Sequence, residues 1–510
     1  MAELPGIYID EPDLVFGYQK EEKDPRLGLK QYGPYFSPSE KAPSPSQVRV
    51  GIIGSGETIT LARQALEQLK GPIRSDESNR WLYPDFPGFS LETRIRSEIV
   101  TADRWNVSLK QTEIDGILKI VDVNERIAAT SQLFAEKLQA IALEEDPPQV
   151  IICALPWVIE EYCGISRRTR GAKRPRFTEL EKTQSDLRAK HVTFLSDWGL
   201  EFAKSKDEDA ARDYDLHNSM KGKAMKIGIP IQLLRESSLR GVLEYPSSRF
   251  ATGQNPATFA WNFSTALYYK ALGKPWRLAK LVPGTCYVGI AFYRNLRSPN
   301  LNIETSMAQI FTHSGEGFVL RGSDVVVDQE TKEAHLTEKQ AEDLMRDVLE
   351  KYALKVGVGP SRVVVHKTSS FTDEEKTGFR KSIGKAPTDF VAIRRSTPIR
   401  FLRVGEYPVL RGTVILLTSS EYLLFTGGYI PRLRTYPGAR IPEPLHVLHE
   451  GDSDARTVSA EVLGLTKLNW NTTAFSTNRP ITLEFASRVG AILSELPEGY
   501  PVQDHYRFYM

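Results

Sequence analysis

The sequence is poor in cysteine, in charge of one sign and in long apolar runs, and each shortage excludes a class of protein. The three cysteines, Cys153, Cys163 and Cys286, are too few and odd in number for a disulfide framework, and two of them lie in apolar runs. We therefore expect buried thiols in a reducing compartment and no metal site built on cysteine. Lys and Arg number 66 against 64 Asp and Glu, so the net charge of +2 provides no overall field that would attract nucleic acid.

No apolar run approaches the roughly 18 residues that a membrane-spanning helix needs. Residues 1–17 are acidic and interrupted by proline, without the basic start of a signal peptide. The sequence therefore predicts a cytoplasmic protein that makes no contact with a membrane.

Apolar residues are plentiful, at 41% of 510, which is enough for about two to four domains with their own cores. The first half alternates between continuous apolar runs and helical periodicity. This alternation predicts an α/β fold with a parallel, Rossmann-like sheet. The elements are a strand at 48–54, a helix at 58–69, a helix around 127–141 and a strand at 149–155.

The second half follows another pattern, and its order of elements is that of a ribonuclease H-type domain. We predict strands at 286–292, 307–311 and 317–321, then a helix at 339–352, a strand at 362–366, a helix at 372–383, a strand at 389–393 and a final amphipathic helix at 483–493. The Pro/Ser-rich stretch at 37–46 reads as a surface loop. We expect a lead-in segment at 1–45, a first domain at 46–280 and a second domain at 281–510.

Gly54, Ser55 and Gly56 follow the first strand and precede a helix, where glycines would let backbone amides approach a pyrophosphate. Ile59 occupies the place of the third glycine of that motif, so we favour a plain tight turn. A Rossmann-type nucleotide-binding enzyme or sensor is the alternative. It predicts cofactor affinity that does not depend on the lysines described next.

A basic stretch at 217–232 places His217 and Lys221 four residues apart, on one face of a helix. Gln232 follows after a break at Gly228. A cation, an imidazole and an amide would converge there, although a solvated basic helix fits the same pattern. Further along, Asn262 and Lys270 precede a Gly-Lys-Pro-Trp sequence at 273–276.

Taken together, these residues resemble the MID domain of Argonautes. In that family a Tyr or His, a Lys four residues later, a Gln, and a Lys in an Asn-containing helix surround the 5′-phosphate of a guide strand. Lysine ammonium groups and amide donors suit a terminal phosphate, which carries up to two negative charges. The resemblance implies a guide 5′-phosphate site formed by His217, Lys221, Gln232, Asn262, Lys270 and Lys274. It also implies a Mg²⁺ ion held between the phosphate, Gln232 and a carboxylate supplied by Met510.

The resemblance extends over almost the whole chain. Residues 14–35 look like the segment that leads into the MID domain, with Asp-Pro-Arg and Gly-Pro-Tyr landmarks, and the second half looks like a PIWI domain. This implies a short Argonaute with a Rossmann-like MID domain and a ribonuclease H-like PIWI domain, and without N-terminal or PAZ domains.

PIWI domains that cut nucleic acid hold two divalent ions with four acidic or histidine side chains. At three of these positions the sequence has Ala291, Thr368 and Ser487, and the remaining ligand would be Glu330 or Glu333. Neutral side chains do not balance the charge of two dications. The resemblance therefore implies no catalytic metal and no cleavage. A self-sufficient guide-directed nuclease is the alternative, and it predicts magnesium-dependent cutting opposite the middle of the guide.

Clusters of basic residues offer further contacts to a phosphate backbone. The stretch at 167–176 holds six cations and no acid, and it fits a backbone contact, a partner contact or a solvated loop. By resemblance, the guide–target channel would be lined by Arg394, Arg395, Arg434, Arg440, Thr466, Lys467 and Asn469, with Arg400 and Arg403 nearby.

Short Argonautes of this appearance resemble the guide-holding half of bacterial defence systems against phages or plasmids. The resemblance implies an APAZ-domain partner that carries a TIR or sirtuin NAD-consuming domain or a nuclease, in a heterodimer that oligomerises on target binding. It further implies a guide RNA and a single-stranded DNA target.

Overall fold

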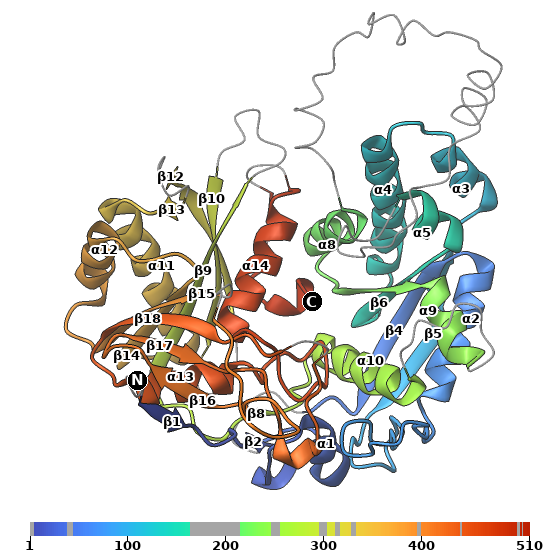
Figure 1. Cartoon of the computed structure of the whole chain (residues 1–510). Helices are drawn as coiled ribbons and strands as arrows, with labels where there is room; N and C mark the ends of the chain where they lie inside the picture. Colours follow the sequence, from blue (N-terminus) through green and yellow to red (C-terminus); the bar gives the residue numbers. More distant parts are fainter. Residues whose placement is uncertain are drawn as a thin grey trace, which may run out of the picture.

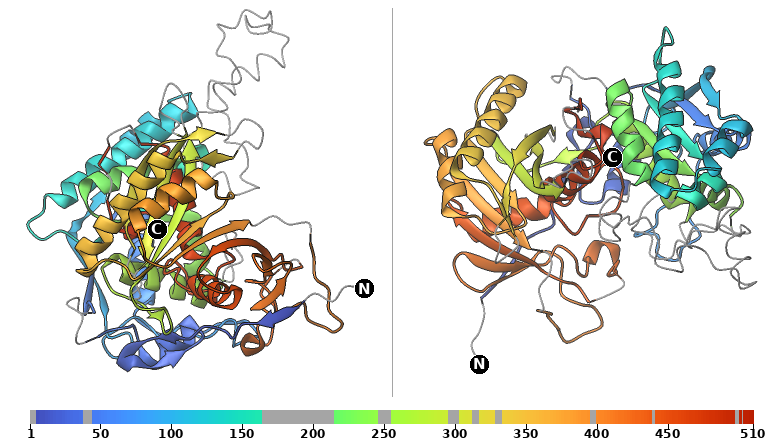
Figure 2. Two further views of the ribbon diagram at one scale, coloured as in Figure 1. Left: turned by 90° about the vertical axis from the view of Figure 1, so that its left-hand side faces the viewer. Right: turned by 90° about the horizontal axis from the view of Figure 1, so that it is seen from above.

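The structure is a computed structural model, and two β-sheets, each covered by helices, lie side by side in it (Figure 1). It describes residues 5–37, 44–163, 215–245, 255–294, 303–311, 317–327, 333–394, 399–438, 441–496, 500–501 and 503–510. We name the two halves after their sheets, the parallel-sheet lobe and the mixed-sheet lobe. Seen from above, they form two separate masses that meet near the C-terminus (Figure 2).

The parallel-sheet lobe contains a four-stranded sheet in the order β5-β4-β6-β7, with all strands parallel. Its elements are β4 (Gln47–Gly54), α2 (Gly56–Gln68), β5 (Glu98–Ser108), α3 (Gln111–Leu118), α4 (Val123–Ala142), β6 (Val150–Leu155), α5 (Trp157–Cys163), α8 (Leu216–Ile227), β7 (Ile231–Arg235), α9 (Glu236–Leu243) and α10 (Pro256–Lys270). The predicted parallel sheet is confirmed.

Every residue of β6 is buried, because helices cover both faces of the sheet. Ile152 packs in the core that contains α2 and α9, and Cys153 packs on the opposite face, with α4 and α8. The three cysteines are free and buried, as predicted. The sequence did not predict the edge strand β5, whose residues are largely polar.

The mixed-sheet lobe contains a nine-stranded sheet in the order β1-β16-β17-β18-β15-β14-β9-β10-β11. Strands β9, β10 and β11 form an antiparallel meander, and β14 and β15 follow as parallel strands after one helix each. The predicted order of elements is therefore present. The elements are β9 (Thr285–Arg294), β10 (Ile303–Phe311), β11 (Val319–Asp324), β12 (Val326–Val327), β13 (Ala334–His335), α11 (Glu338–Val356), β14 (Arg362–Lys367), α12 (Asp373–Ile383), β15 (Thr388–Arg394), β16 (Thr413–Leu416), β17 (Glu421–Leu424), η3 (Pro431–Leu433), β18 (Leu445–Gly451), α13 (Ala455–Leu465), α14 (Ile481–Leu493) and η4 (Tyr506–Phe508).

Alternate residues of the central strands face different helices. Val363 packs with Met345 of α11 and Phe379 of α12, whereas Val364 packs in the core that includes Leu483 of α14. The apolar face of α14, the helix predicted at 483–493, therefore packs against the sheet.

A buried charge network joins β14, β15, β18 and α13. Asp389 accepts hydrogen bonds from Arg362 Nη2 at 2.7 Å, from Ser453 N at 2.9 Å and from His449 Nε2 at 2.9 Å. Glu461 pairs with the other end of the Arg362 guanidinium, at 2.5 Å from Nη1. Each buried charge has a partner of opposite sign, as the low dielectric of the interior requires.

The lead-in segment contacts both lobes. Strand β1 (Gly6–Tyr8) pairs with β16 at the edge of the mixed sheet, and Glu11 forms ion pairs with Arg411 at 2.8 Å and Lys467 at 2.7 Å. The following elements are β2 (Leu14–Val15), η1 (Gly17–Gln19), β3 (Glu21–Glu22) and α1 (Pro25–Tyr32), and β8 (Arg277–Leu278) completes a three-stranded sheet in the order β3-β2-β8. In the part of the chain that the structure describes, no helix is both long and apolar enough to cross a membrane.

Candidate functional site

The basic stretch predicted to bind phosphate lies where the two lobes meet. Helix α8 begins after the N-cap Asp215 and ends at Gly228, whose left-handed conformation (φ 85°) turns the chain into β7. His217 and Lys221 lie one turn apart on α8, and Gln232 lies on β7. Lys270 is the last residue of α10. In Figure 1 the C-terminus lies between α8 and α14.

The structure brings four of the predicted residues into contact in two pairs, Lys221 with Met510 and Lys270 with Gln232. The Lys221 ammonium donates a hydrogen bond to the main-chain oxygen of Ile231 at 2.6 Å and another to the main-chain oxygen of Met510. The Lys270 ammonium donates a hydrogen bond to Gln232 Oε1. We call His217, Lys221, Gln232 and Lys270 the cationic cup.

The cup holds positive charge out of water. Lys221 is 1% exposed and Lys270 is 0% exposed. Burial lowers the pKa of Lys221 from its ordinary value of 10.5 to about 7; the Cys153 thiol opposes this shift, and the positive charge of Arg488 adds to it. Burial also lowers the pKa of Lys270 well below its ordinary value, and Lys221 and Arg488 lower it further.

His217 shares this electrostatic environment. Burial, followed by the positive charge of Lys221, lowers the pKa of its imidazole to about 3. The ring is therefore neutral near pH 7 and can offer one N–H to a ligand. Among the residues that the structure describes, no carboxylate side chain compensates Lys221 or Lys270. Two buried lysines without an Asp or Glu partner, one of them hydrogen-bonded to the main-chain oxygen of Met510, make a site that favours an anion.

Arg488 is a residue of the site that sequence reasoning missed. It comes from α14 of the mixed-sheet lobe, and its charge acts on His217, Lys221 and Lys270. Its guanidinium also contacts Glu484 Oε1 at 3.3 Å, and about a third of its side chain is exposed. The only signal in the sequence was a cation within the predicted helix at 483–493, next to Ser487.

Close packing between α8 and α14 fixes how the lobes meet at the cup. Glu495 Oε1 accepts hydrogen bonds from Asp215 N at 3.0 Å and from Asn218 Nδ2 at 3.2 Å, and so caps the start of α8 from the other lobe. At Gly222 an added Cβ would lie 2.2 Å from a methyl of Leu496. A larger residue there would require the Leu496 side chain to move.

Two further residues assigned to the phosphate have other contacts in the structure. Asn262 Oδ1 accepts hydrogen bonds from Thr473 N at 2.8 Å and from the Thr472 hydroxyl at 3.1 Å, so it joins α10 to the mixed-sheet lobe. The Lys274 ammonium lies over the ring of Tyr35, 5.7 Å from its centroid.

The residues predicted to line the guide–target channel divide into exposed and buried groups. Arg394 donates to Ser370 Oγ at 2.7 Å and contacts Glu333 at 3.3 Å, and Arg434 lies over the ring of Trp81. The Arg394 side chain is partly exposed, and the Arg434 side chain is exposed. Arg395, Arg440, Glu330 and the basic stretch at 167–176 lie outside the described residues.

The structure buries Thr466, Lys467 and Asn469 inside the mixed-sheet lobe. The Lys467 ammonium pairs with Glu11 and lies 3.7 Å from the ring centroid of Phe475, and Thr466 accepts a hydrogen bond from Arg411. Lys467 thus helps to hold the lead-in segment in place, and the Thr466 hydroxyl is turned to a partner inside the protein.

The three neutral residues at the expected metal-ligand positions lie on β9, after β14 and on α14. Ile290 pairs with Lys367 in the parallel register, and Ala291 and Thr368 each follow one member of that pair. Ser487 Oγ donates to Leu483 O at 3.1 Å within α14, a helix that packs across β9. Within the described ranges, no group of three or more His, Cys, Asp or Glu side chains is arranged to hold a metal.

The turn at Gly54 has a packing explanation. An added Cβ at Gly54 would lie 2.4 Å from Thr58 Oγ1 and 2.7 Å from Ala154 O. Ser55 Oγ caps α2 by accepting from Thr58 N at 3.2 Å. The glycine thus allows the close approach of β4, β6 and α2, as a tight turn requires.

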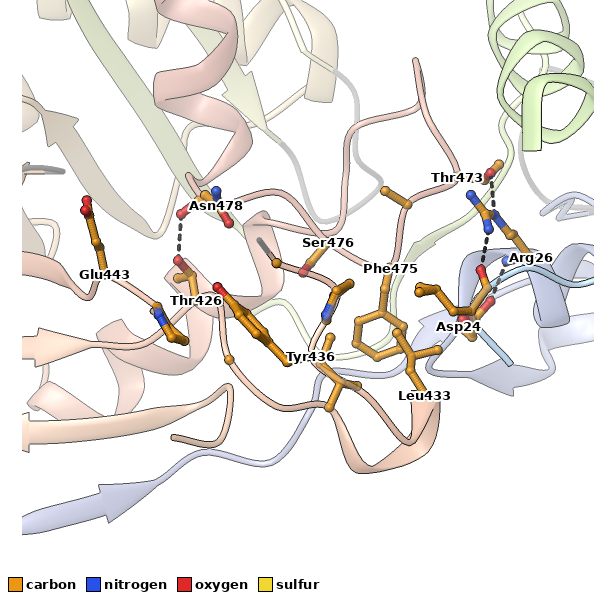
Figure 3. Close-up of a pocket in the computed structure, with 18 of the residues that line it drawn as sticks. Asp24, Arg26, Thr426, Leu433, Tyr436, Glu443, Thr473, Phe475, Ser476 and Asn478 are labelled. Carbon is orange, nitrogen blue, oxygen red and sulfur yellow. Dashed lines mark hydrogen bonds between the residues drawn. The ribbon is translucent and has the colours of Figure 1, made fainter. Parts of the chain in front are cut away.

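A pocket of about 550 Å³ lies where the lead-in segment, residues 82–83 and the mixed-sheet lobe meet (Figure 3). In its wall, Arg26 donates to Leu82 O at 2.6 Å and to Thr473 Oγ1 at 3.0 Å, and Thr426 donates to Asn478 O at 2.6 Å. Ile430, Leu433 and Phe475 form a small apolar cluster beside it. These contacts join segments distant in sequence, so we assign the pocket to the seam between the lobes.

No protein-family model and no curated protein matches the sequence. Solved structures do match. Clostridium butyricum Argonaute bound to a guide DNA and a 19-mer target DNA matches 99% of the chain at 14% identity, with a TM-score of 0.64. Drosophila Piwi matches 99% at 12% identity, with a TM-score of 0.57. Marinitoga piezophila Argonaute in complex with a 5′-hydroxyl guide RNA matches 100% at 12% identity, with a TM-score of 0.54.

The chain spans between 55% and 60% of the length of these structures. Their similarity covers both lobes and the lead-in segment. At these identities the match establishes the fold, and the chain has the MID–PIWI-like α/β fold of Argonaute proteins along nearly its whole length.

Proposed function

We propose that the chain binds a guide strand by its 5′-phosphate in the cationic cup and presents that strand to a complementary target. The observation that carries the proposal is the pair of buried ammonium groups, Lys221 and Lys270, without an Asp or Glu partner among the described residues. Two of the structures with this fold contain a guide, one with a target.

A terminal phosphate suits the cup better than an internal one. It carries between one and two negative charges near pH 7 and three acceptor oxygens, which match two ammonium groups, the His217 ring and the nearby Arg488. An internal phosphodiester has one charge and is flanked by two sugars. Because the ammonium groups are buried, the end of a strand would meet less steric hindrance there than an internal phosphate between two sugars.

We further propose that the mixed-sheet lobe positions the guide–target duplex and does not cut it. Ala291, Thr368 and Ser487 carry no charge at the positions where the family's metal ligands stand. Arg394 and Arg434 are exposed enough to meet a phosphate backbone, which would hold the duplex by its shape while base pairing provides the sequence specificity.

The output of such a protein is an activated partner. We propose a guide RNA, a single-stranded DNA target and a cytoplasmic APAZ-domain effector with a TIR or sirtuin NADase or a nuclease, in a heterodimer that oligomerises when the target binds. Such an assembly would act in defence against phages or plasmids. Isolating the chain from its native host and identifying the polypeptide and short nucleic acids that copurify tests this part.

The 5′-phosphate site is tested by measuring the dissociation constants of a 5′-phosphorylated RNA and the same RNA with a 5′-hydroxyl. We expect Lys221→Ala and Lys270→Ala each to weaken binding of the phosphorylated RNA by about 1–3 kcal/mol, the scale of a charge-assisted hydrogen bond, and the hydroxyl RNA to bind like these variants. Lys226→Ala is the matched control, because Lys226 is exposed on the same helix. Equal binding of the two RNAs to the wild type would contradict the proposal.

A labelled target strand mixed with the guide-loaded protein and Mg²⁺ or Mn²⁺ tests the absence of cleavage. We expect the target to remain intact. A cut opposite the middle of the guide would show that the chain is itself a nuclease.

A further inference from the structure

Strained backbone gathers on one surface, which is made by the lead-in segment, the loop before β5 and the chain after α10. Five non-glycine residues among those described have a positive φ, and four of them belong to these three segments: Tyr18 (58°), Gln19 (56°), Arg96 (51°) and Leu272 (70°). A side chain makes this backbone costly, and residues held in it cluster at sites that bind a ligand. Glycine would adopt the same backbone without strain, so the side chains at these positions require an explanation.

The side chains on this surface combine aromatic rings with cations. Tyr18 is 50% exposed, and the Arg96 guanidinium lies over its ring, 5.2 Å from the centroid, and donates a hydrogen bond to its hydroxyl. The Phe36 ring meets the Tyr18 ring edge-on, with 5.3 Å between the two centroids. We call Tyr18, Phe36, Arg96, Lys274 and Arg277 the aromatic–cation patch.

The ring of Tyr35 joins the other two cations to the patch. The Lys274 ammonium and the Arg277 guanidinium lie over this ring, 5.7 Å and 5.1 Å from its centroid. Arg277 also donates a hydrogen bond to Gln19 Oε1 at 3.2 Å, which links β8 to the residue after Tyr18. Among the residues that the structure describes, no carboxylate forms an ion pair with Arg96 or Arg277, because their contacts are to neutral groups. Their positive charge is therefore available to an anion.

Exposed rings between cations fit a single strand of nucleic acid better than a duplex. Every unpaired base has a face that can stack on an aromatic ring or a guanidinium, and its phosphate can pair with a cation, whereas neighbouring bases cover these faces in a duplex. The patch also lies beside the cup. Lys274 follows Lys270 by four residues, so their Cα atoms are at most about 14 Å apart, and the charge of Lys274 reaches His505 near the C-terminus. In Figure 1, β2, β8 and α1 lie below α10, at the base of the molecule.

We propose that the aromatic–cation patch binds the single-stranded part of the target that continues past the 5′ end of the guide. The inference rests on the proposed guide-binding function, because the cup fixes the guide's 5′ end and base pairing then fixes where the target leaves the duplex. It goes beyond that function, since neither the phosphate nor the pairing requires this surface. An unpaired base stacks against Tyr18, and the adjoining phosphates pair with Arg96 and Arg277.

The experiment measures how tightly the full chain, loaded with a guide RNA, binds two single-stranded DNA targets. One target ends opposite the guide's first nucleotide, and the other continues at its 3′ end for about ten nucleotides, the size of a typical single-strand site. We expect the extension to tighten binding at least about fivefold, the effect of one stacked base. Equal binding of the two targets would overturn the inference and leave the proposed function intact. Failure of the shorter target to bind the guide-loaded chain would overturn the proposed function itself.

Two variants show whether the gain comes from the patch. Tyr18→Gly and Arg96→Gly each remove a side chain and suit the left-handed backbone, so they introduce no strain. We expect both to lose most of the gain and to bind the shorter target as the wild type does. Tyr8→Ala on β1 and Arg104→Ala on β5 are the matched controls and should keep the gain, because Tyr8 is similarly exposed and Arg104 also lies over an aromatic ring. A full gain in both patch variants would overturn the inference, and a protein missing from their preparations would then be the ligand of the patch.

Discussion

Replacing Lys270 with methionine should stabilise the guide-free protein and at the same time weaken guide binding. The ammonium is fully buried, its pKa is lowered by burial and by Lys221 and Arg488, and its one hydrogen bond in the structure goes to a neutral amide oxygen, Gln232 Oε1. Replacing a buried ion pair or triad with apolar residues of similar size gains up to roughly 1–4 kcal/mol, and we take this as the scale for the buried Lys270 ammonium. The lost hydrogen bond costs about 1 kcal/mol.

The net gain should be about 0–3 kcal/mol, which corresponds to a rise in Tm of up to roughly 6 °C for a domain of this size. Binding of a 5′-phosphorylated RNA should weaken by about 1–3 kcal/mol, or roughly 5- to 150-fold. Differential scanning fluorimetry with and without guide measures both effects. The guide should raise the Tm of the wild type more than that of Lys270→Met.

Two results would refute this reasoning. A Lys270→Met variant less stable than the wild type would show that the ammonium is a structural element of the lobe. A variant that binds the phosphorylated RNA as tightly as the wild type would show that the phosphate lies elsewhere. Lys226→Met, on the exposed face of α8, should change neither quantity.

The described contacts lead to four further predictions. Affinity for a 5′-phosphorylated RNA should fall as pH rises from 7 to 9. The pKa of Lys221 is about 7 without guide and a bound phosphate raises it, so guide binding takes up protons. An affinity that stays constant or rises over this pH range contradicts the assignment of Lys221 to the phosphate. Asp389→Asn should lower the free energy of unfolding by about 3–5 kcal/mol in denaturant titrations, because Arg362 loses a buried partner. Burial alone would raise the pKa of Asp389, but hydrogen bonds from His449, Ser453 and Arg362 outweigh it and lower the pKa. The Asp389 carboxylate therefore stabilises the fold fully above its ordinary pKa of 3.8, and this contribution is lost as the pH falls below that value. Wild-type stability that does not change below about pH 4 contradicts this. Asn262→Ala should lower stability by about 1–2 kcal/mol and leave the preference for a 5′-phosphate unchanged, and a loss of that preference would place Asn262 in the cup.

The sequence predicted the strands whose burial is continuous and missed those whose pairing depends on distant segments. Strand β6 is buried on both faces and reads as an unbroken apolar run, so its pattern identified it. Strand β5 is an edge strand with polar residues such as Asp103 and Asn106, which look like a loop in the sequence. Strand β1 has three residues, and its partner β16 lies about 400 positions further along the chain.

The same difference between local pattern and contacts with distant segments applies to the candidate site. Helical spacing placed His217 and Lys221 on one face of α8, and the fold brought Gln232 and Lys270 into contact. Arg488 acts on them only because α14 docks against α8 across the lobes, a contact that no local spacing encodes. Lys467 resembled a surface cation, but Glu11 pairs with it from the other end of the chain.

The path of residues 9–47 has a practical consequence for dividing the protein. Strand β1 lies at the edge of one sheet, the chain then passes through the three-stranded sheet and enters the other lobe, and residues 271–284 return through β8, which pairs antiparallel with β2. Two covalent straps therefore cross between the halves. A fragment divided at the first connection would lose the pairing of β1 with β16, and one divided at the second would lose the pairing of β8 with β2. Neither half should therefore be expressed alone as a fragment divided near the middle of the chain.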